Sequence, residues 1–241
     1  MKFYEFDEKE KKVDIFSERW YRHPESGKFY RSVTTILGII DKGYQFEEWL
    51  KNNGHNAEII VDRAGRFGTD FHKLVERFLK GETISYMDIA YQDERTSTML
   101  WERFNIWFRF WKEFTSKNTV KIIDTEYITY SEEYEYAGTI DLTCLVNDEL
   151  TIMDWKTGNN LGNKEKLQMQ AYMKSINATK AILVHIPAIK PNQKGYKLIE
   201  VAFNEAQFDL FLATKRVFDM ENTDQPKILT LPLSLNIEDT L

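Results

Sequence analysis

The sequence predicts a mixed α/β fold in which helices cover the faces of a central sheet. Apolar residues recur at three- and four-residue spacing along several long segments, as they do in helices that pack on one side. Between residues 120 and 155 the apolar period changes to two, which is typical of strands. Helical and strand patterns then alternate, an order expected of a sheet with helices on its faces.

The first half of the chain is expected to contain short strands and then helices. Residues 1–31 alternate polar with aromatic or β-branched residues around a turn-like Pro-Glu-Ser-Gly segment, which predicts short strands or a hairpin. Apolar periodicity then predicts helices at roughly 33–41, 45–52, 56–80 and 96–114.

The second half is expected to supply the rest of the sheet. Strands are predicted at 120–130, 136–146 and 150–155, with a tight turn at 147–149 joining the last two. A helix at about 164–177, strands at 181–186 and 196–201, and a helix at about 204–220 follow. The apolar run within 226–241 fits either an edge strand or a loose tail.

Length and composition fit one globular domain. The chain has 241 residues, of which 42% are hydrophobic and 29% charged, near the average for soluble proteins. We therefore expect a single domain over 1–241, built from a hairpin and mostly helical elaboration (1–115), an α/β core (116–222) and a tail (223–241).

The sequence also excludes several classes of protein. No apolar run approaches the ~20 residues that span a bilayer, and the first residues resemble no signal or transit peptide, so an intracellular protein without membrane contact is expected. Cys144 is the only cysteine, which excludes an internal disulfide, a cysteine-ligated iron–sulfur cluster and a thiolate zinc site. No Walker A sequence is present, so no nucleotide cofactor is expected.

The net charge of -6 argues against a protein that coats nucleic acid through its overall field. It does not exclude an enzyme that gathers carboxylates to hold cations and groups its basic residues where phosphates run. Because Cys144 is the only cysteine, any bound metal is expected to use oxygen and imidazole ligands.

Three residues on two adjacent predicted strands form the strongest candidate site. Strand alternation places Asp154 and Lys156 on one face and Trp155 on the other. Asp141 lies on the preceding strand, which the tight turn should pair with this one. Two carboxylates beside a solvated face suit Mg²⁺, and a nearby lysine relieves their repulsion. A structural ion-pair cluster is the alternative.

Two helices carry further candidates at four-residue spacing. His72 and Glu76 share one helical face, as do Gln168 and Tyr172. On a helical wheel His72 falls at the border between an apolar side and a basic side, which favours a role in a site over one in the core. Glu76 is expected either to anchor His72 or to pair with Arg77 or Lys80.

Together these motifs resemble the RecB-like branch of the PD-(D/E)XK nucleases. The motifs that carry the resemblance are His72-x-x-x-Glu76, Gly138-Thr-Ile-Asp141, Asp154-Trp-Lys156-Thr-Gly and Gln168-x-x-x-Tyr172. A shorter segment, Ser32-Val-Thr-Thr-Ile-Leu37, is similar to the start of mitochondrial genome maintenance exonucleases and their phage relatives.

The resemblance implies a restriction-endonuclease-like fold and a metal-dependent deoxyribonuclease. It implies that Asp141 and Asp154 ligate Mg²⁺ or Mn²⁺ together with His72 and the backbone carbonyl of Trp155, and that Lys156 positions the attacking water. The residues it assigns to DNA binding or to support of the site are Gln168, Tyr172, Glu76, Thr157, Ser32 and Thr34.

The implied substrate is DNA that is single-stranded or has single-stranded ends. The implied setting is a phage or bacterial enzyme of DNA repair or recombination, with replication or recombination proteins as partners. Two alternatives stay open, namely a structure-specific endonuclease on the same core and a DNA-binding module without activity.

Two further features have more than one interpretation. Glu126, on the strand before Asp141, is either an additional acidic ligand or a solvated glutamate. In the aromatic helix, residues 101, 104, 108, 111 and 114 form an apolar stripe that predicts core packing, and Phe110 lies off this stripe. We therefore expect Phe110 to be the exposed aromatic residue, available to stack on a base.

Overall fold

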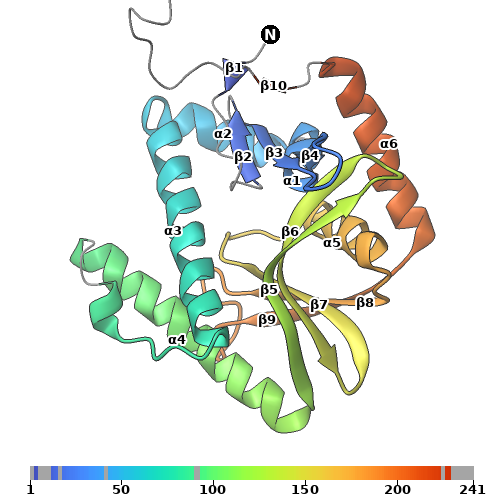
Figure 1. Cartoon of the computed structure of the whole chain (residues 1–241). Helices are drawn as coiled ribbons and strands as arrows, with labels where there is room; N and C mark the ends of the chain where they lie inside the picture. Colours follow the sequence, from blue (N-terminus) through green and yellow to red (C-terminus); the bar gives the residue numbers. More distant parts are fainter. Residues whose placement is uncertain are drawn as a thin grey trace, which may run out of the picture.

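An eight-stranded mixed sheet forms the centre of the computed structural model, which describes residues 3–4, 12–15, 18–40, 43–89, 93–223 and 226–228 (Figure 1). Its strands are β2 (Lys12–Ile15), β3 (Glu18–Arg22), β4 (Phe29–Ser32), β5 (Val120–Ser131), β6 (Tyr136–Val146), β7 (Glu149–Lys156), β8 (Lys180–His185) and β9 (Lys197–Ala202). The order is β2-β3-β4-β6-β7-β8-β9, and β5 also pairs with β6. The pairs β4–β6 and β7–β8 are parallel and the others antiparallel.

The helices follow the predicted order closely. They are α1 (Val33–Ile36), α2 (Tyr44–Asn53), α3 (Asn56–Leu79), α4 (Glu94–Lys117), α5 (Asn163–Ile176) and α6 (Glu205–Glu221). Short 3-10 helices lie at η1 (Leu37–Ile39) and η2 (Tyr86–Asp88). The helix predicted at 33–41 is therefore shorter, because α1 tightens into η1 at Leu37. The predicted α/β class, a mixed sheet flanked by helices, is confirmed.

The hairpin between β6 and β7 has the predicted tight turn. Asn147 and Asp148 both adopt positive φ angles, 51° and 70°, which a two-residue turn of this kind requires and which Asn and Asp tolerate. Leu142 pairs with Met153 at the end of this register, and Asp141 and Asp154 are the next residues of the two strands. The turn therefore sets which residues of the two strands meet.

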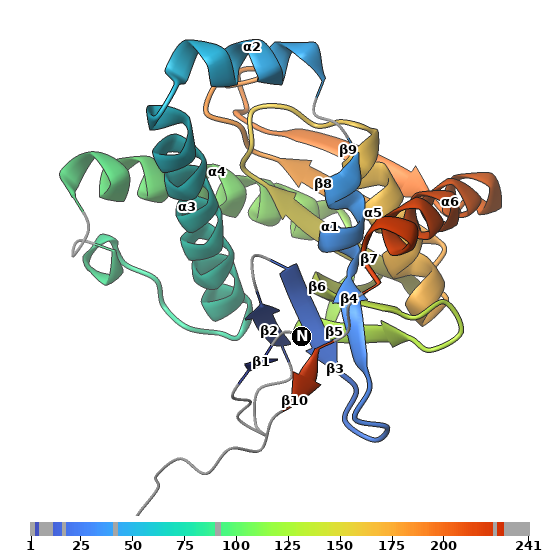
Figure 2. The same ribbon diagram turned by 90° about the horizontal axis from the view of Figure 1, so that it is seen from above.

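The two faces of the sheet carry separate cores. Figure 2 shows α3 and α4 on one side of the molecule and α1, α5 and α6 on the other. Buried residues of α3 and α4, such as Phe71 and Trp107, pack with Trp155 of β7. Buried residues of α5 and α6, such as Met169 and Phe211, pack with Ile140 of β6 and Ile152 of β7. Both faces of β6 and β7 are thus covered, as their nearly continuous apolar sequences require.

The expected exposure of Phe110 is wrong. Phe110 is only 1% exposed, whereas Phe108, placed in the core by the apolar stripe, is 39% exposed. The reason is that α4 is packed on more than one side. Its Phe104 and Trp107 contact Phe78 of α3, while its Phe110 contacts Trp155 of the sheet and Tyr196 in the loop before β9. A single stripe underestimates the buried surface of such a helix.

The ends of the described chain meet in a separate two-stranded sheet. β1 (Phe3–Tyr4) pairs in parallel with β10 (Lys227–Ile228). An edge strand is thus present near the start of the 226–241 segment, and residues 229–241 lie outside the described residues. Among the residues that the structure describes, no helix has both the length and the apolar character needed to cross a membrane.

Gly138 allows α5 to approach β6 closely. A Cβ atom on Gly138 would overlap the ring of Tyr172, lying 2.9 Å from its Cζ and from its hydroxyl oxygen. We expect Gly138→Ala to destabilise the protein by about 1–3 kcal/mol, as other overpacked cores do. Denaturant unfolding measures this. Gly65→Ala is the control, because a Cβ there meets no atom within 4 Å and helix propensity should stabilise α3 by up to about 1 kcal/mol. Equal effects of the two substitutions would contradict the close packing.

Candidate active site

The carboxylates of Asp141 and Asp154 lie buried on the paired strands β6 and β7. Asp141 is 8% exposed and Asp154 2% exposed. The backbone N–H of Trp155 donates a hydrogen bond to Asp141 Oδ2 at 2.8 Å, which ties one strand to the side chain of the other. Two acidic side chains are therefore held side by side in a nearly dry part of the sheet, as the strand pairing predicted.

Lys156 lies beside the second carboxylate. Its Nζ is 2.8 Å from Asp154 Oδ2, and it also donates a hydrogen bond to Oε1 of Gln168 at 3.1 Å. Gln168 in turn donates through Nε2 to the hydroxyl of Tyr172 at 3.1 Å. Trp155 points to the opposite face and packs against Trp107. The predicted alternation along β7 is thus observed, and α5 supplies a polar chain that orients the lysine.

His72 reaches the same centre from α3. Its Nδ1 lies 3.2 Å from Asp141 Oδ1, and its Nε2 lies 3.0 Å from the carbonyl oxygen of Trp155. α3 can bring the histidine there because the apolar side of the helix, which includes Phe71 and Val75, is buried against the sheet. The border position of His72 on the helix therefore places its ring at the edge of the core, over the carboxylates.

Glu126 of β5 completes the cluster, and the sequence had left its role open. Its Oε1 is 4.0 Å from His72 Nδ1, and ligand atoms of Glu126, His72 and Asp141 all lie within 4.8 Å of one another. Glu126 has a φ angle of 52°, which is uncommon for a residue other than glycine and occurs here within a strand that also contains a β-bulge. This backbone conformation locally redirects the strand where its carboxylate joins the site.

A signal for Glu126 was present in the strand register. Thr125 pairs with Leu142 and Tyr127 with Ile140, so Glu126 lies opposite Asp141. Aligning the two predicted strands across their connection would have brought these acids together. The sequence pattern alone did not fix that alignment, because the connection at 132–135 is longer than a two-residue turn.

The electrostatics of the cluster reflect an excess of buried negative charge. Burial, together with the charge of Asp141, raises the pKa of Glu126 to about 7. Burial likewise raises the pKa of Asp154 to about 6, although Lys156 opposes this effect. Burial would lower the pKa of His72, but the charge of Asp141 and their hydrogen bond outweigh it and raise this pKa to about 9. The raised pKa values mean that Glu126, Asp154 and His72 hold their protons more tightly than usual. The same negative charge would also attract a metal cation to this cluster.

Asp141 remains ionised because its neighbours are cationic or donate hydrogen bonds. Burial by itself raises the pKa of Asp141, yet His72, Lys156 and the N–H of Trp155 together hold it below the usual value. Burial also opposes the charge on Lys156, and Asp154 and Asp141 outweigh that effect and raise its pKa. Each buried charge therefore depends on a partner within the same small group.

The donor atoms of His72, Glu126 and Asp141 lie close enough together to hold one metal ion. Adjacent ligands of an octahedral Mg²⁺ or Mn²⁺ ion, with bonds of about 2.1 Å, lie about 3 Å apart, and opposite ligands lie about 4.2 Å apart. His72 Nδ1 is 3.2 Å from Asp141 Oδ1 and 4.0 Å from Glu126 Oε1, and all three donor atoms lie within 4.8 Å of one another. One imidazole and two carboxylates suit Mn²⁺ as well as Mg²⁺. Asp154 lies outside this group of three, in contact with Lys156.

The remaining residues assigned by the resemblance lie in different surroundings. Glu76 accepts a hydrogen bond from Lys80 at 2.5 Å, which is the ion pair considered in the sequence analysis. Thr157 directly follows β7 and faces α3, where a Cβ on Gly68 would lie 3.7 Å from its Oγ1. Ser32 caps α1 by accepting a hydrogen bond from the N–H of Thr35, and it also contacts the hydroxyl of Thr34. The contacts of Ser32 are thus those of a helix cap.

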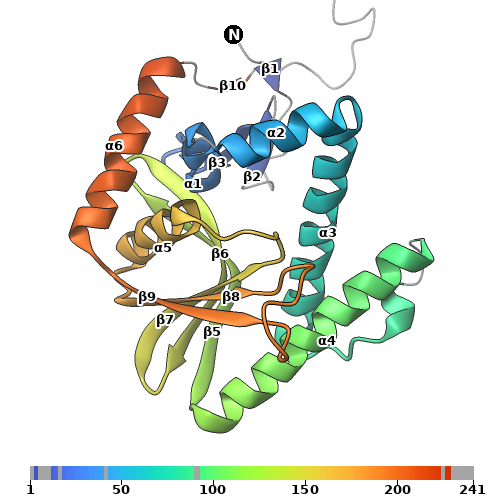
Figure 3. The ribbon, with the colours of Figure 1, turned by 180° about the vertical axis from the view of Figure 1, so that it is seen from behind.

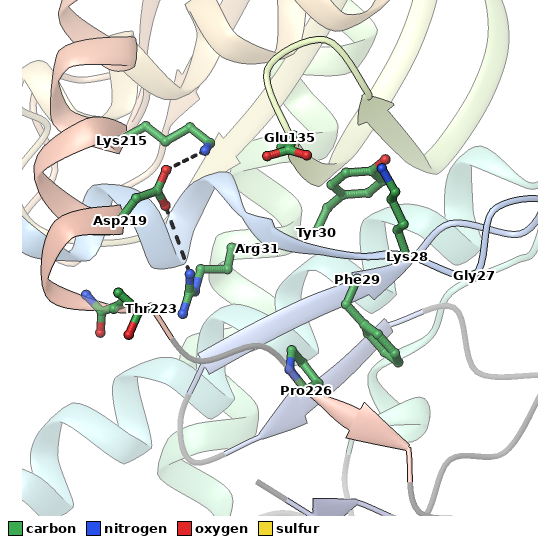
Figure 4. Close-up of a pocket in the computed structure, with 11 residues that line it drawn as sticks. Gly27, Lys28, Phe29, Tyr30, Arg31, Glu135, Lys215, Asp219, Thr223 and Pro226 are labelled. Atoms are coloured by element: carbon green, nitrogen blue, oxygen red, sulfur yellow. Dashed lines mark hydrogen bonds and ion pairs between the residues drawn. The ribbon is translucent and has the colours of Figure 1, made fainter. Parts of the chain in front are cut away.

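A cavity of about 700 Å³ near the C-terminal end of α6 is separate from these residues (Figure 4). Its lining includes Arg31, Lys215 and Asp219, and Figure 4 shows the last two joined by an ion pair that continues to Arg31. None of the residues predicted for the site lines this cavity. The candidate active site is therefore the carboxylate cluster at β5, β6 and β7.

Comparison with solved structures gives distant similarities. An alkaline exonuclease (LHK-Exo) from Laribacter hongkongensis has 12% identity and a TM-score of 0.42, over 79% of this chain and 86% of that chain. The same protein in complex with dAMP has 14% identity and a TM-score of 0.40, over the same shares of the two chains. A phage-related exonuclease from Haemophilus somnus has 11% identity and a TM-score of 0.35, over 65% of this chain and 82% of that chain.

No curated protein matches the chain in sequence. A family model does match it. The model describes the PD-(D/E)XK nuclease superfamily and matches residues 44–230, a range that contains His72, Glu126, Asp141, Asp154 and Lys156. Because this match covers most of the chain, the chain belongs to the PD-(D/E)XK nuclease superfamily.

Proposed function

We propose that this nuclease is a RecB-like exonuclease that hydrolyses phosphodiester bonds of DNA with Mg²⁺ or Mn²⁺, starting from single-stranded ends. The observation that supports it best is the buried cluster in which His72 and Asp141 meet Glu126 while Lys156 contacts Asp154. A cation-binding group and a lysine then lie within one small site. This is the combination that metal-assisted hydrolysis requires.

Asp141, Glu126 and His72 would hold the metal, with Asp154 and the carbonyl of Trp155 beside them. When bound, the ion would polarise the phosphate and lower the pKa of water. The chain's own part is to fix these donors. Asp141 is held by the N–H of Trp155, and His72 is held between Asp141 and the Trp155 carbonyl. The donors are thereby oriented before any ligand arrives.

Lys156 would add positive charge where the attacking water and the phosphate meet. Its Nζ is held between Asp154 and Gln168, and Gln168 is in turn held by Tyr172. The raised pKa of Lys156 keeps the ammonium charged at neutral pH. A charged group fixed in advance stabilises developing negative charge without reorganisation, which is the basis of its catalytic value.

The exonuclease proposal and its two alternatives predict different products. With Mg²⁺ or Mn²⁺, an exonuclease degrades linear single-stranded DNA and leaves circular single-stranded DNA intact, and EDTA stops the reaction. Gel analysis of both substrates measures this. Asp141→Asn is the negative control, because it keeps the shape and the acceptor for the Trp155 N–H but loses the charge; we expect its rate to fall by about 100-fold or more.

Cleavage of circular DNA at the linear rate would establish an endonuclease instead. Binding without cleavage under both metals would establish a binding module. Turnover by Asp141→Asn equal to that of the unsubstituted protein in Mg²⁺ would remove the proposed metal site.

Lys156→Ala should act on the chemical step. We expect kcat to fall by about 100- to 1000-fold, while the dissociation constant for DNA, measured with EDTA, changes by less than about threefold. Lys197→Ala, an exposed lysine on β9, is the control for loss of one positive charge. Thermal unfolding must accompany the test, because the substitution leaves Asp154 buried without its partner. A large loss of DNA affinity with unchanged turnover of bound DNA would make Lys156 a binding residue.

His72 should make metal binding depend on pH. In the metal-free protein its pKa is raised from 6.5 to about 9, so its stabilising contribution is complete below pH 6.5 and is lost as the pH rises through 9. A metal ligand must be unprotonated, so the cation competes with this proton. We expect the Mn²⁺ concentration for half-maximal activity to fall between pH 7 and pH 9, by up to about tenfold per pH unit.

His72→Ala should raise the required Mn²⁺ concentration and weaken its pH dependence between pH 7 and 9, with activity partly restored by excess Mn²⁺. His55→Ala, at an exposed histidine before α3, should change neither. An unchanged metal requirement together with a lower melting temperature would show that His72 is a packing residue.

A further inference from the structure

A second cleft opens beside the candidate active site and is lined by arginines. It has a volume of about 1130 Å³ and lies between α3, the N-terminal part of α4 and the loops that follow β7 and β8. Figure 3 shows both loops reaching toward α3 and α4. Arg63 and Arg66 come from α3, Arg95 and Arg103 from α4, and Thr157–Asn159 from the loop after Lys156. Four basic side chains from two helices thus converge on one space.

The charges of these arginines are not matched by ion pairs. In the part of the chain that the structure describes, no ion pair to a carboxylate is found for any of the four guanidinium groups, although the charge of Arg63 acts on the Asp93 carboxylate. Outside the cleft the same helices behave differently, since Arg77 pairs with Glu82 and Asp88, and Lys117 pairs with Glu113. In a protein of net charge -6, this is a local surplus of positive charge.

The acids that line the cleft do not cancel this surplus. The cleft is lined by two carboxylates, Asp70 and Asp93, and by four arginines, so its lining carries a net charge of about +2. The Asp93 carboxylate is also committed to the helix, because it accepts the N–H of Thr96 at 3.0 Å and so caps α4. An anion is therefore the ligand that the charge of this cleft favours.

Among the four arginines, Arg103 gives the strongest indication that the cleft binds an anion. It is only 4% exposed, and it makes neither a hydrogen bond nor an ion pair with any described residue. Burial lowers the pKa of its guanidinium, and the charge of the neighbouring Glu102 opposes this effect only in part. The group remains charged at neutral pH. The carboxylate of Glu102 is itself paired with Lys190, so a bound anion would supply the opposite charge that a largely buried guanidinium favours.

The cleft is adjacent to the candidate catalytic centre. Arg66 precedes His72 by six residues on α3, about 9 Å along the helix axis. On the other wall, Thr157 directly follows Lys156 and lies against α3 near Gly68. A polyanion bound in the cleft would therefore continue toward the carboxylate cluster. Ile60 and Met99 add apolar surface to the lining, which suits a strand with unpaired bases.

We propose that this cleft binds internal phosphodiester groups of the DNA strand next to the bond that is cleaved, with Arg103 at its floor. The assignment rests on the proposed nuclease function and specifies where the substrate strand runs. Arg63, Arg66 and Arg95 contact phosphates at the rim, and Arg103 contacts one in the interior. Guanidinium groups suit this task because their N–H groups match two oxygens of one phosphate.

Binding of single-stranded oligonucleotides by the full chain tests the assignment. Fluorescence anisotropy with EDTA present separates affinity from cleavage. We expect Arg103→Met to weaken binding about tenfold and Arg66→Gln/Arg95→Gln to do so by a similar factor. Each lost contact should reduce the slope of log affinity against log salt by about 0.7. Arg109→Gln, an exposed arginine of α4 outside the cleft, is the matched control. Unchanged affinity in both cleft variants would overturn the proposal.

Two further readouts separate this assignment from its rivals. If Arg103 serves only the fold, Arg103→Met lowers the melting temperature and leaves affinity intact; under our proposal the melting temperature is unchanged or higher, because an unpaired buried charge is removed. Strands with and without a terminal phosphate form the second comparison. A loss seen only with terminally phosphorylated strands would overturn the assignment to internal phosphodiesters. A wild-type protein that binds DNA here but does not cleave it would contradict the nuclease function alone.

Discussion

The burial of two carboxylates on adjacent strands is the constraint on which the rest of the site depends. Two unit charges about 4 Å apart at an effective dielectric constant near 20 interact by about 4 kcal/mol, a large part of the stability of a typical domain. Asp141 and Asp154 can therefore stay ionised together only beside cations and donors. Lys156, His72 and the N–H of Trp155 supply these, and each comes from a different direction.

The two helical layers bring the compensating groups to the sheet. The core beneath α3 and α4 holds His72 over Asp141, because the neighbouring Phe71 and Val75 are buried there. On the other face, α5 can bring Gln168 to Lys156 because Gly138 leaves room for the ring of Tyr172. The packing of the core therefore determines the electrostatics of the site. Residues that fill the two cores also set where His72 and Gln168 lie relative to Asp141 and Lys156.

The chain separates its charges in space. Negative charge gathers at β5 and β6, where protons or a cation neutralise it, and uncompensated positive charge gathers between α3 and α4. A protein of net charge -6 can in this way bind a polyanion without a basic overall field. The two regions meet at α3 and at the loop after β7, so a strand held by one would be presented to the other.

Local periodicity and turn chemistry are enough to predict the fold class, nearly all helices and strands, and the face shared by Asp154 and Lys156. The same periodicity places His72 at the edge of the core. The remaining features depend on contacts between elements that are distant in the sequence. The role of Glu126 depends on the register across β5 and β6, the burial of Phe110 on the contacts that α4 makes with two partners, and the convergence of the arginines on how α3 meets α4. A periodic pattern shows which side of an element is apolar. Which elements meet that side is settled only when the layers pack together.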